Sequence, residues 1–380
     1  MMPPDALERL RLARSEGVGP IAYRRLIRRY GDAGAALAAL PALARAGGRA
    51  VPPRIPSARA AAREIEAVAA RGGRHLFLDT DAYPPLLAAL EDAPPVLAFE
   101  GDTDLLARPA IAIVGARNAS LNGRRIAAEL AEALAGAGYI VVSGLARGID
   151  AAAHEGALRA GTSFAAIAGG LDRPYPPENA ALQARLAAAG GVFAEAPLGT
   201  APQARHFPRR NRIIAGLALG CVVVEAALRS GSLITARLAA EAGREVFAVP
   251  GSPRDPRCLG SNHLLRQGAH LTETLADILD NLPARGEAGQ GRRFRETLAP
   301  IAPAAAAMAP DPEPMAVDDD GRAALLSLLG PAPVAVDELL RYCHLSPAAV
   351  MAALLELEIA GRVETLPGNR VAVIAGSAVS

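Results

Sequence analysis

Six short runs of apolar residues alternate with helical stretches between residues 110 and 249, and this alternation constrains the fold more than any other feature. The runs are rich in Val, Ile and Phe and show no polar alternation, which is typical of strands buried on both faces of a parallel sheet. We therefore predict an α/β fold with a Rossmann-like, mostly parallel sheet as its core. The predicted strands are residues 110–114, 139–142, 163–168, 191–194, 221–224 and 245–249.

Two further strand candidates, residues 75–78 and 95–99, could extend this sheet at an edge. Ahead of them, residues 7–40 have apolar spacing of helical period that breaks at Gly17-Val18-Gly19-Pro20, which predicts two short helices joined by a tight glycine turn.

The carboxyl-terminal part of the chain has a different character. Residues 283–317 combine Pro, Ala and Gly without apolar periodicity, which indicates a linker. Helices are expected at 321–329, 337–343 and 346–360, followed by two short strands around Pro367-Gly368-Asn369, the order of a winged helix. The expected organisation is a small helical domain resembling a helix-hairpin-helix or SAM domain at 1–73, an extended Rossmann-like domain at 74–282, the linker at 283–317, and a winged-helix domain at 318–380.

The chain has no lysine, so all 40 basic residues are arginine. This excludes a Walker A loop and a pyridoxal Schiff base, since both need a lysine. The three cysteines lack paired spacing, which argues against a zinc site and for a reducing compartment. The longest apolar run, residues 213–224, is shorter than the ~18 residues that a membrane span needs. We expect a cytoplasmic protein that uses no membrane, metal or cofactor.

Glycine, serine and arginine follow the predicted strands, where a parallel sheet binds its ligands. Glycine lets backbone amides approach an anion, and arginine offers a bidentate clamp for phosphate. Ordinary tight turns are the alternative for any one loop, but several such loops meet at one edge. We therefore expect a phosphate-binding surface there. Its residues are Gly115 and Arg117, Ser143, Gly144, Arg147 and Gly148, Gly169 and Gly170, Asn179, and Ser230, Gly231, Ser232 and Thr235.

A nicotinamide-dependent dehydrogenase is not expected, because Gly115-Ala-Arg-Asn-Ala-Ser lacks the second glycine of the dinucleotide fingerprint. Residues 205–216 instead place four arginines around one aromatic ring. Single-stranded nucleic acid is held in this way, with arginines on phosphates and an aromatic side chain stacked on a base. The alternative is a solvated helix start with Phe207 in the core. The expected DNA-binding residues here are Phe207, Arg209, Arg210, Asn211 and Arg212.

Five ordered strings resemble the DNA-processing protein A (DprA/Smf) family. They are Ser-Gly-Leu-Ala-Arg-Gly-Ile-Asp (143–150), Gly-Leu-Asp-x-x-Tyr-Pro-x-x-Asn (170–179), Phe-Pro-x-Arg-Asn-Arg-Ile-Ile-Ala-Gly (207–216), Glu-Ala-x-x-x-Ser-Gly-Ser-Leu-Ile-Thr-Ala (225–236) and Gly-Arg-Glu-Val-Phe-Ala-Val-Pro-Gly (243–251).

This resemblance implies a non-enzymatic protein that binds and protects incoming single-stranded DNA in natural transformation, works as a homodimer through its Rossmann-like domain, and loads the RecA recombinase. Some family members carry a Lys near the loop where this chain has Glu178, which puts one basic contact in doubt.

The flanking domains differ in charge. Residues 1–73 carry 13 arginines and 6 acidic residues, and the glycine turn followed by Arg24, Arg25, Arg28 and Arg29 resembles a helix-hairpin-helix that binds phosphate. A packing domain with a solvated arginine face is the alternative. The expected third helix of the winged helix carries Glu356 and Glu358 and no arginine, so we expect a protein-interaction or regulatory role for it.

Two other functions remain open from the residues. Similar sheets serve phosphoribohydrolases that act on nucleoside monophosphates, for which Glu225 is the candidate acid, although the Pro-Gly-Gly-x-Gly-Thr string of those enzymes is absent. A nucleotide-sensing regulator would use the winged helix as its output, which the acidic third helix argues against. No residue is assigned a catalytic or metal-binding role.

Overall fold

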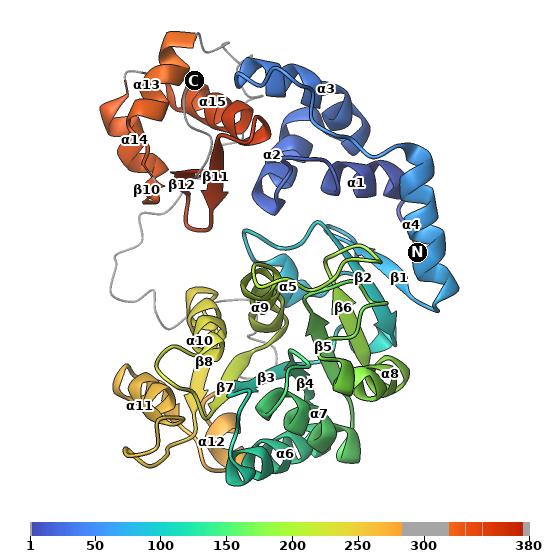
Figure 1. Ribbon diagram of the computed structural model, residues 1–380, viewed down its shortest axis with the longest axis vertical. Coiled ribbons are helices and arrows are strands. Elements are labelled where there is room, and N and C mark those ends of the chain that lie inside the picture. Colours follow the sequence, from blue (N-terminus) through green and yellow to red (C-terminus); the bar gives the residue numbers. More distant parts are fainter. Residues whose placement is uncertain (1, 283–318, 331, 344, 375–380) are drawn as a thin grey trace. The chain divides into compact units, whose positions relative to one another are not determined.

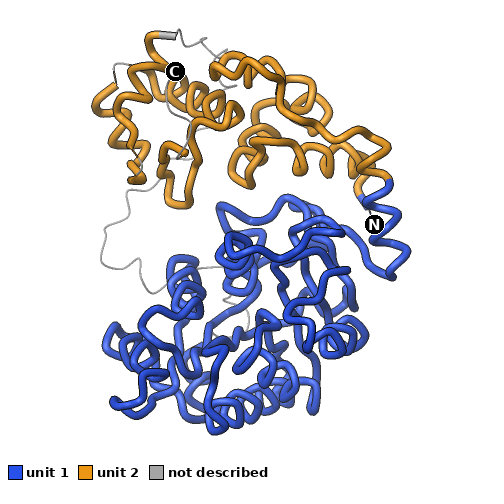
Figure 2. Tube along the Cα trace, in the orientation of Figure 1, with its two compact units in different colours: residues 1–2, 63–294 blue, residues 3–62, 295–380 orange. Residues whose placement is uncertain are grey.

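The computed structural model describes residues 2–282, 319–330, 332–343 and 345–374 (Figure 1). Apart from the first two residues, these form two compact units, one within residues 63–294 and one that combines residues 3–62 with residues 295–380 (Figure 2). The sequence predicts the amino-terminal helices and the winged helix as separate domains. In the structure they share one unit. The expected linker lies outside the described residues.

The larger unit contains a sheet of nine described strands in the order β1-β2-β6-β5-β4-β3-β7-β8-β9. All neighbours from β6 to β9 are parallel, whereas β2 is antiparallel to both β1 and β6. This confirms the mostly parallel core and the two extra strands at one edge. The strands are β1 (Arg74–Phe77), β2 (Val96–Gly101), β3 (Ala110–Gly115), β4 (Ile140–Ser143), β5 (Ser163–Ile167), β6 (Gly191–Ala194), β7 (Gly220–Val224), β8 (Glu245–Ala248) and β9 (His270–Leu271).

The sequence reading missed β9, which has only two residues and so shows no periodicity. The chain runs outward from β3 through β4 and β5 to β6, and then returns to place β7 on the other side of β3. The strand order therefore reverses between β3 and β7. In open parallel sheets, ligands bind beyond the carboxyl ends of the strands at such a reversal.

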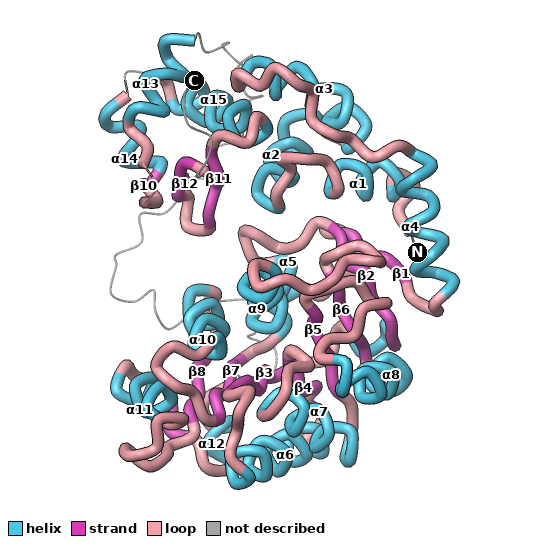
Figure 3. Tube along the Cα trace, viewed as in Figure 1, coloured by secondary structure: helices cyan, strands magenta, loops and turns pink. Residues whose placement is uncertain are grey.

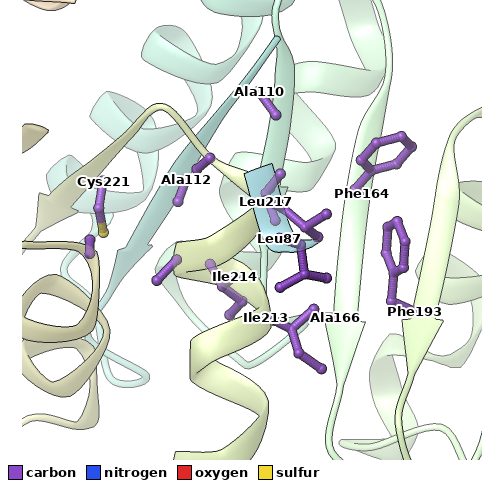
Figure 4. Packing of buried hydrophobic residues seen from close by; sticks show 14 of the residues in the cluster. Leu87, Ala110, Ala112, Phe164, Ala166, Phe193, Ile213, Ile214, Leu217 and Cys221 are labelled. Atoms are coloured by element: carbon purple, nitrogen blue, oxygen red, sulfur yellow. The ribbon is translucent and has the colours of Figure 1, made fainter. Parts of the chain in front are cut away.

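Helices cover both faces of the sheet (Figure 3). The helix α9 packs Ile213, Ile214 and Leu217 into one apolar cluster with Ala112 and Phe164 of the strands (Figure 4). Helices α6 and α7 cover the opposite face, which holds a second cluster. The described helices of this unit are α5 (Pro85–Ala88), α6 (Leu121–Gly136), α7 (Ile149–Ala160), α8 (Ala180–Ala189), α9 (His206–Leu217), α10 (Gly231–Glu241), α11 (Leu259–Arg266) and α12 (Leu275–Leu279), with 3-10 turns at Thr103–Leu105 and Pro177–Asn179. The helix α4 (Ala58–Ala70) spans the boundary between the two units.

In the smaller unit, the prediction of two helices over residues 7–40 is wrong, because three helices form. Gly31 adopts φ +85° after α2, and the Asp32 side chain accepts a hydrogen bond from the Ala35 amide (2.8 Å) and so starts another helix. The winged helix is confirmed, with its strands in the order β10-β12-β11. The elements are α1 (Ala6–Ala13), α2 (Pro20–Tyr30), α3 (Ala33–Ala46), α13 (Asp319–Ser327), β10 (Val334–Ala335), α14 (Val336–Tyr342), α15 (Pro347–Ile359), β11 (Val363–Leu366) and β12 (Arg370–Val373).

Among the described residues, no single helix is long and apolar enough to cross a membrane. Of the helix pairs that the structure describes, α14 and α15 taken together reach that length and composition, and they meet at a bend of 120°.

Candidate nucleic-acid interface

Two loops from distant parts of the sequence meet around the ring of Phe207, at the start of α9. The Arg117 guanidinium carbon, in the loop after β3, lies 5.0 Å from the ring centroid, and that of Arg210 lies 5.9 Å from it. The ring of Tyr175, in the loop after β5, packs edge-on against Phe207 with a centroid distance of 5.7 Å. We call Arg117, Tyr175, Phe207 and Arg210 the edge cluster.

The sequence reading named every member of the edge cluster except Tyr175. Tyr175 is 48% exposed, and it packs against the same Phe207 ring that the two guanidinium groups flank. The signal that could have found it was an aromatic residue in a loop directly after a predicted strand.

Arg210 is the buried member of the edge cluster. Its guanidinium donates a hydrogen bond to the Ala166 carbonyl (2.7 Å), and its Nη1 fills the space that a side chain at Gly144 would need. Burial and the neighbouring charge of Arg117 lower the pKa of Arg210 to about 10, although nearby Asp150 opposes the shift. Arg210 therefore keeps its charge at neutral pH while its donors stay inside the protein.

Asp150, at the start of α7, organises the loop after β4. Its carboxylate accepts hydrogen bonds from the amides of Gly144 (3.2 Å) and Ala146 (3.3 Å). Burial raises the pKa of this carboxyl, although Arg210 counteracts the shift. The Gly144 amide, which we expected to face a phosphate, is thus directed to a carboxylate of the protein itself.

The loop after β4 also exposes Arg147 and is held in place by residues that follow β5. Arg147 has 64% of its side chain exposed and forms an ion pair with Glu178, which raises the pKa of Arg147 and lowers that of Glu178. The Asn179 amide donates to the carbonyls of Leu145 (2.9 Å) and Ala146 (3.3 Å). Asn179 therefore positions the loop, and Gly148 turns it with φ +77°.

Several of the expected glycines and serines shape this edge of the sheet from within. A β-carbon at Gly115 would collide with the Val224 carbonyl, and one at Gly169 would lie 2.8 Å from the Thr200 carbonyl. The Gly170 amide donates to the same carbonyl (3.0 Å). The buried Ser143 hydroxyl donates to the Ile113 carbonyl (2.6 Å). These residues allow close packing of the loops rather than presenting donors to solvent.

The remaining α9 residues that we expected to bind DNA differ in the solvent exposure of their side chains. Arg209 is exposed, whereas Arg212 is buried and donates to the Glu195 carboxylate (2.6 Å) and to the Asp92 carbonyl. The Asn211 amide donates weakly to the Gly231 carbonyl (3.4 Å) and so links α9 to α10. Of the basic residues placed here by sequence, Arg209 lies at the surface and Arg212 serves the interior.

The start of α10 lies after β7. The Ser230 hydroxyl caps this helix by accepting from the Ser232 amide (3.3 Å) and lies 2.6 Å from the Ser232 hydroxyl. Gly231 is exposed, whereas Thr235 is buried at 2%. Of this group, Gly231 and the half-buried Ser230 reach solvent.

Two buried titratable residues near this edge of the sheet, Glu225 and His154, have structural partners. The Glu225 carboxylate accepts from the amide (2.8 Å) and the hydroxyl of Ser120, the residue that caps α6. His154 is fully buried, accepts from the Leu145 amide (3.3 Å) through Nε2, and contacts the Ser163 hydroxyl (2.7 Å) through Nδ1. Burial lowers the pKa of His154 to about 3, so it is neutral. Within the described ranges, no group of three or more His, Cys, Asp or Glu side chains is placed to hold a metal ion.

Comparison with known proteins places this geometry in a family. The family model described as DNA recombination-mediator protein A matches residues 74–283, and models for a DprA-like N-terminal HHH domain and a DprA winged helix domain match residues 3–67 and 304–369.

Relatives match over most of the chain. Protein Smf of Escherichia coli is 41% identical over 77% of this chain and 75% of its own length, and the DNA processing protein DprA of Bacillus subtilis is 41% identical over 61% and 77%. The crystal structure of DNA processing protein A from Streptococcus pneumoniae superposes with a TM-score of 0.62 at 33% identity, over 75% of this chain and all of that one. The chain belongs to the DNA recombination-mediator protein A family.

Proposed function

We propose that this protein binds single-stranded DNA at the carboxyl edge of its sheet and delivers it to the RecA recombinase during natural transformation. The observation that carries the DNA-binding part is the edge cluster, which combines an exposed tyrosine with one arginine from a loop and one from α9. Single-stranded DNA is held by this combination, because every base has a face that can stack and every nucleotide has a phosphate.

The geometry narrows the residues proposed to touch DNA. Arg117, Arg147 and Arg209 are exposed and bind phosphates, while Tyr175 supplies the stacking face with Phe207 behind it. Arg210, Asn179 and the buried glycines hold these groups in place. Arg212 supports α9 through its buried ion pair.

The partners in this proposal follow from the family resemblance. DNA-binding assays on the isolated protein test neither RecA loading nor the formation of a homodimer through the Rossmann-like domain. Light scattering of the purified chain tests whether it forms a homodimer. Strand-exchange assays with RecA on DNA coated by single-strand-binding protein test RecA loading.

The binding site is tested by two variants that affect DNA differently. Arg117→Ala removes one phosphate contact and should flatten the slope of log K against log salt by ~0.7, the value per phosphate of a single strand. Tyr175→Ala removes a stacking face and should weaken binding about tenfold without changing that slope, within the ~1–3 kcal/mol measured per stacked base. Fluorescence anisotropy with a labelled oligonucleotide at several salt concentrations measures both.

Arg159→Ala is the matched control, because Arg159 is an exposed, ion-paired arginine in the last turn of α7, away from the edge cluster. It should change neither affinity nor slope. If all three variants bind like the wild type, the edge cluster is not the DNA site.

A further inference from the structure

Within the smaller unit, the glycine turn between α1 and α2 is covered by the end of α15. Gly17 adopts φ +79°, and a β-carbon there would lie 2.8 Å from the carbonyl oxygen of Ile359. Leu355 and Ile359 of α15 join the apolar core that Leu26 and Leu40 of the amino-terminal helices form. The helix that reads DNA in many winged helices is thus packed against the turn that binds phosphate in helix-hairpin-helix motifs.

A second contact fixes the same helix against the end of α3. A β-carbon at Gly47 would collide with the Glu356 carbonyl and would lie 2.7 Å from the β-carbon of Ala360. Gly47 has φ −72°, so another residue is disfavoured by the neighbouring helix and not by its own backbone. The two backbones meet here without room for a side chain.

The two acidic residues of α15 have separate partners. The Glu356 carboxylate accepts from Arg322 of α13 (2.9 Å) and so belongs to the winged helix itself. The Glu358 carboxylate is buried, accepts from the Thr365 hydroxyl (2.8 Å), and lies 3.9 Å from Nη1 of Arg25. Its other oxygen lies 4.0 Å from the β-carbon position of Gly19, the N-cap of α2. The carboxylate therefore lies between the start of α2 and an arginine of that helix.

That arrangement is the one a helix-hairpin-helix offers to a phosphate: an anion at a helix amino terminus beside a cation. We propose that Glu358 stands in for a DNA phosphate at the glycine turn, so that the winged helix keeps the amino-terminal helices from DNA until α15 moves away. The inference rests on the proposed DNA-binding function. It also gives Glu358, one of the two acidic residues of this helix, a role outside the winged helix.

Opening this contact should add the glycine turn and Arg25 to basic residues of α2 that are already exposed. Arg28 and Arg29 are exposed on α2, one turn beyond Arg25, and the amino-terminal segment has more than twice as many arginines as acidic residues. The uncovered turn, Arg25 and these neighbours would then bind the backbone of either single-stranded or duplex DNA, since phosphate contacts carry no sequence information.

The test forces α15 away without altering any charge. Gly47→Leu places a side chain where α3 and α15 touch, and Gly330→Leu is the control, because nothing lies within 4 Å of a β-carbon at Gly330. In the full-length protein, hydrogen exchange should quicken over residues 15–25 and 355–360 in Gly47→Leu only. Its affinity for DNA should rise several-fold, with the salt slope steeper by roughly 1–2 for one or two added phosphate contacts. Glu358→Gln, which keeps the packing, should show a smaller rise.

Two results would overturn the inference. Faster exchange in Gly47→Leu with unchanged affinity and slope would show that the uncovered turn does not take DNA. Unchanged exchange would show that α15 does not cover the turn. Arg117→Ala, measured in parallel, tests the sheet edge alone. If this variant binds DNA like the wild type, the proposed site at the sheet edge is wrong, but the two glycine variants can still be compared with each other.

Discussion

Arg209 and Arg212 lie three residues apart on α9, and the structure predicts opposite consequences for their removal. Arg212 has 9% of its side chain exposed and is paired with Glu195 (2.6 Å) and with Asp92 (3.8 Å). Arg209 is exposed. We expect Arg212→Ala to unfold the protein more easily, and Arg209→Ala to weaken DNA binding while leaving stability unchanged.

The expected loss of stability follows from the carboxylates that Arg212→Ala leaves without a partner. Removing one partner of a buried ion pair costs about 3–5 kcal/mol, because the other charge stays buried without a counter-ion. Glu195 and Asp92 keep 30% and 22% of their side chains exposed, so water can reach them in part and we expect roughly 2–3 kcal/mol. With an m-value of about 3 kcal/mol/M, the midpoint of urea unfolding should fall by roughly 1 M. An exposed arginine such as Arg209 should change stability by about 0.5 kcal/mol or less.

Urea unfolding followed by circular dichroism measures these midpoints, and anisotropy with single-stranded DNA measures binding of the folded variants. Combining Arg212→Met with Glu195→Gln should recover part of the lost stability, since it removes one of the stranded charges. The reasoning is refuted if Arg212→Ala keeps the wild-type midpoint and loses DNA affinity as Arg209→Ala does, because Arg212 would then be a DNA contact.

The remaining predictions concern two carboxylates. Glu178→Gln should release Arg147 from its ion pair and tighten DNA binding a few-fold, because that pair no longer has to break, whereas Glu155→Gln, which breaks the similarly exposed pair with Arg185, should not; equal affinities of the two variants would exclude Arg147 from the DNA site. Because the Glu225 carboxylate accepts both hydrogen bonds that Ser120 offers, incubation with nucleoside monophosphates should release no free base, and turnover that is lost in Glu225→Gln would instead support a phosphoribohydrolase.

The sequence alone determined the class of fold. Runs of buried β-branched residues and helical spacing act over a few residues, and they located all eight strands of the sheet that are longer than two residues. The same local signals do not predict β9, which has only two residues, or the helix break at Gly31, which depends on a single glycine. Glycine, serine and arginine after successive strands also predicted which edge of the sheet to inspect.

What each of those residues does was decided by tertiary structure. Arg209, Arg210 and Arg212 are indistinguishable along the chain, yet one is exposed, one fills the space beside Gly144, and one pairs with Glu195. Tyr175 gained its significance only from a ring 32 residues further along. Likewise, only the folded chain places Arg25 and Gly19 beside Glu358 of α15. Secondary structure depends on neighbours in sequence, whereas the burial and pairing of a charge depend on segments that meet only when the chain folds.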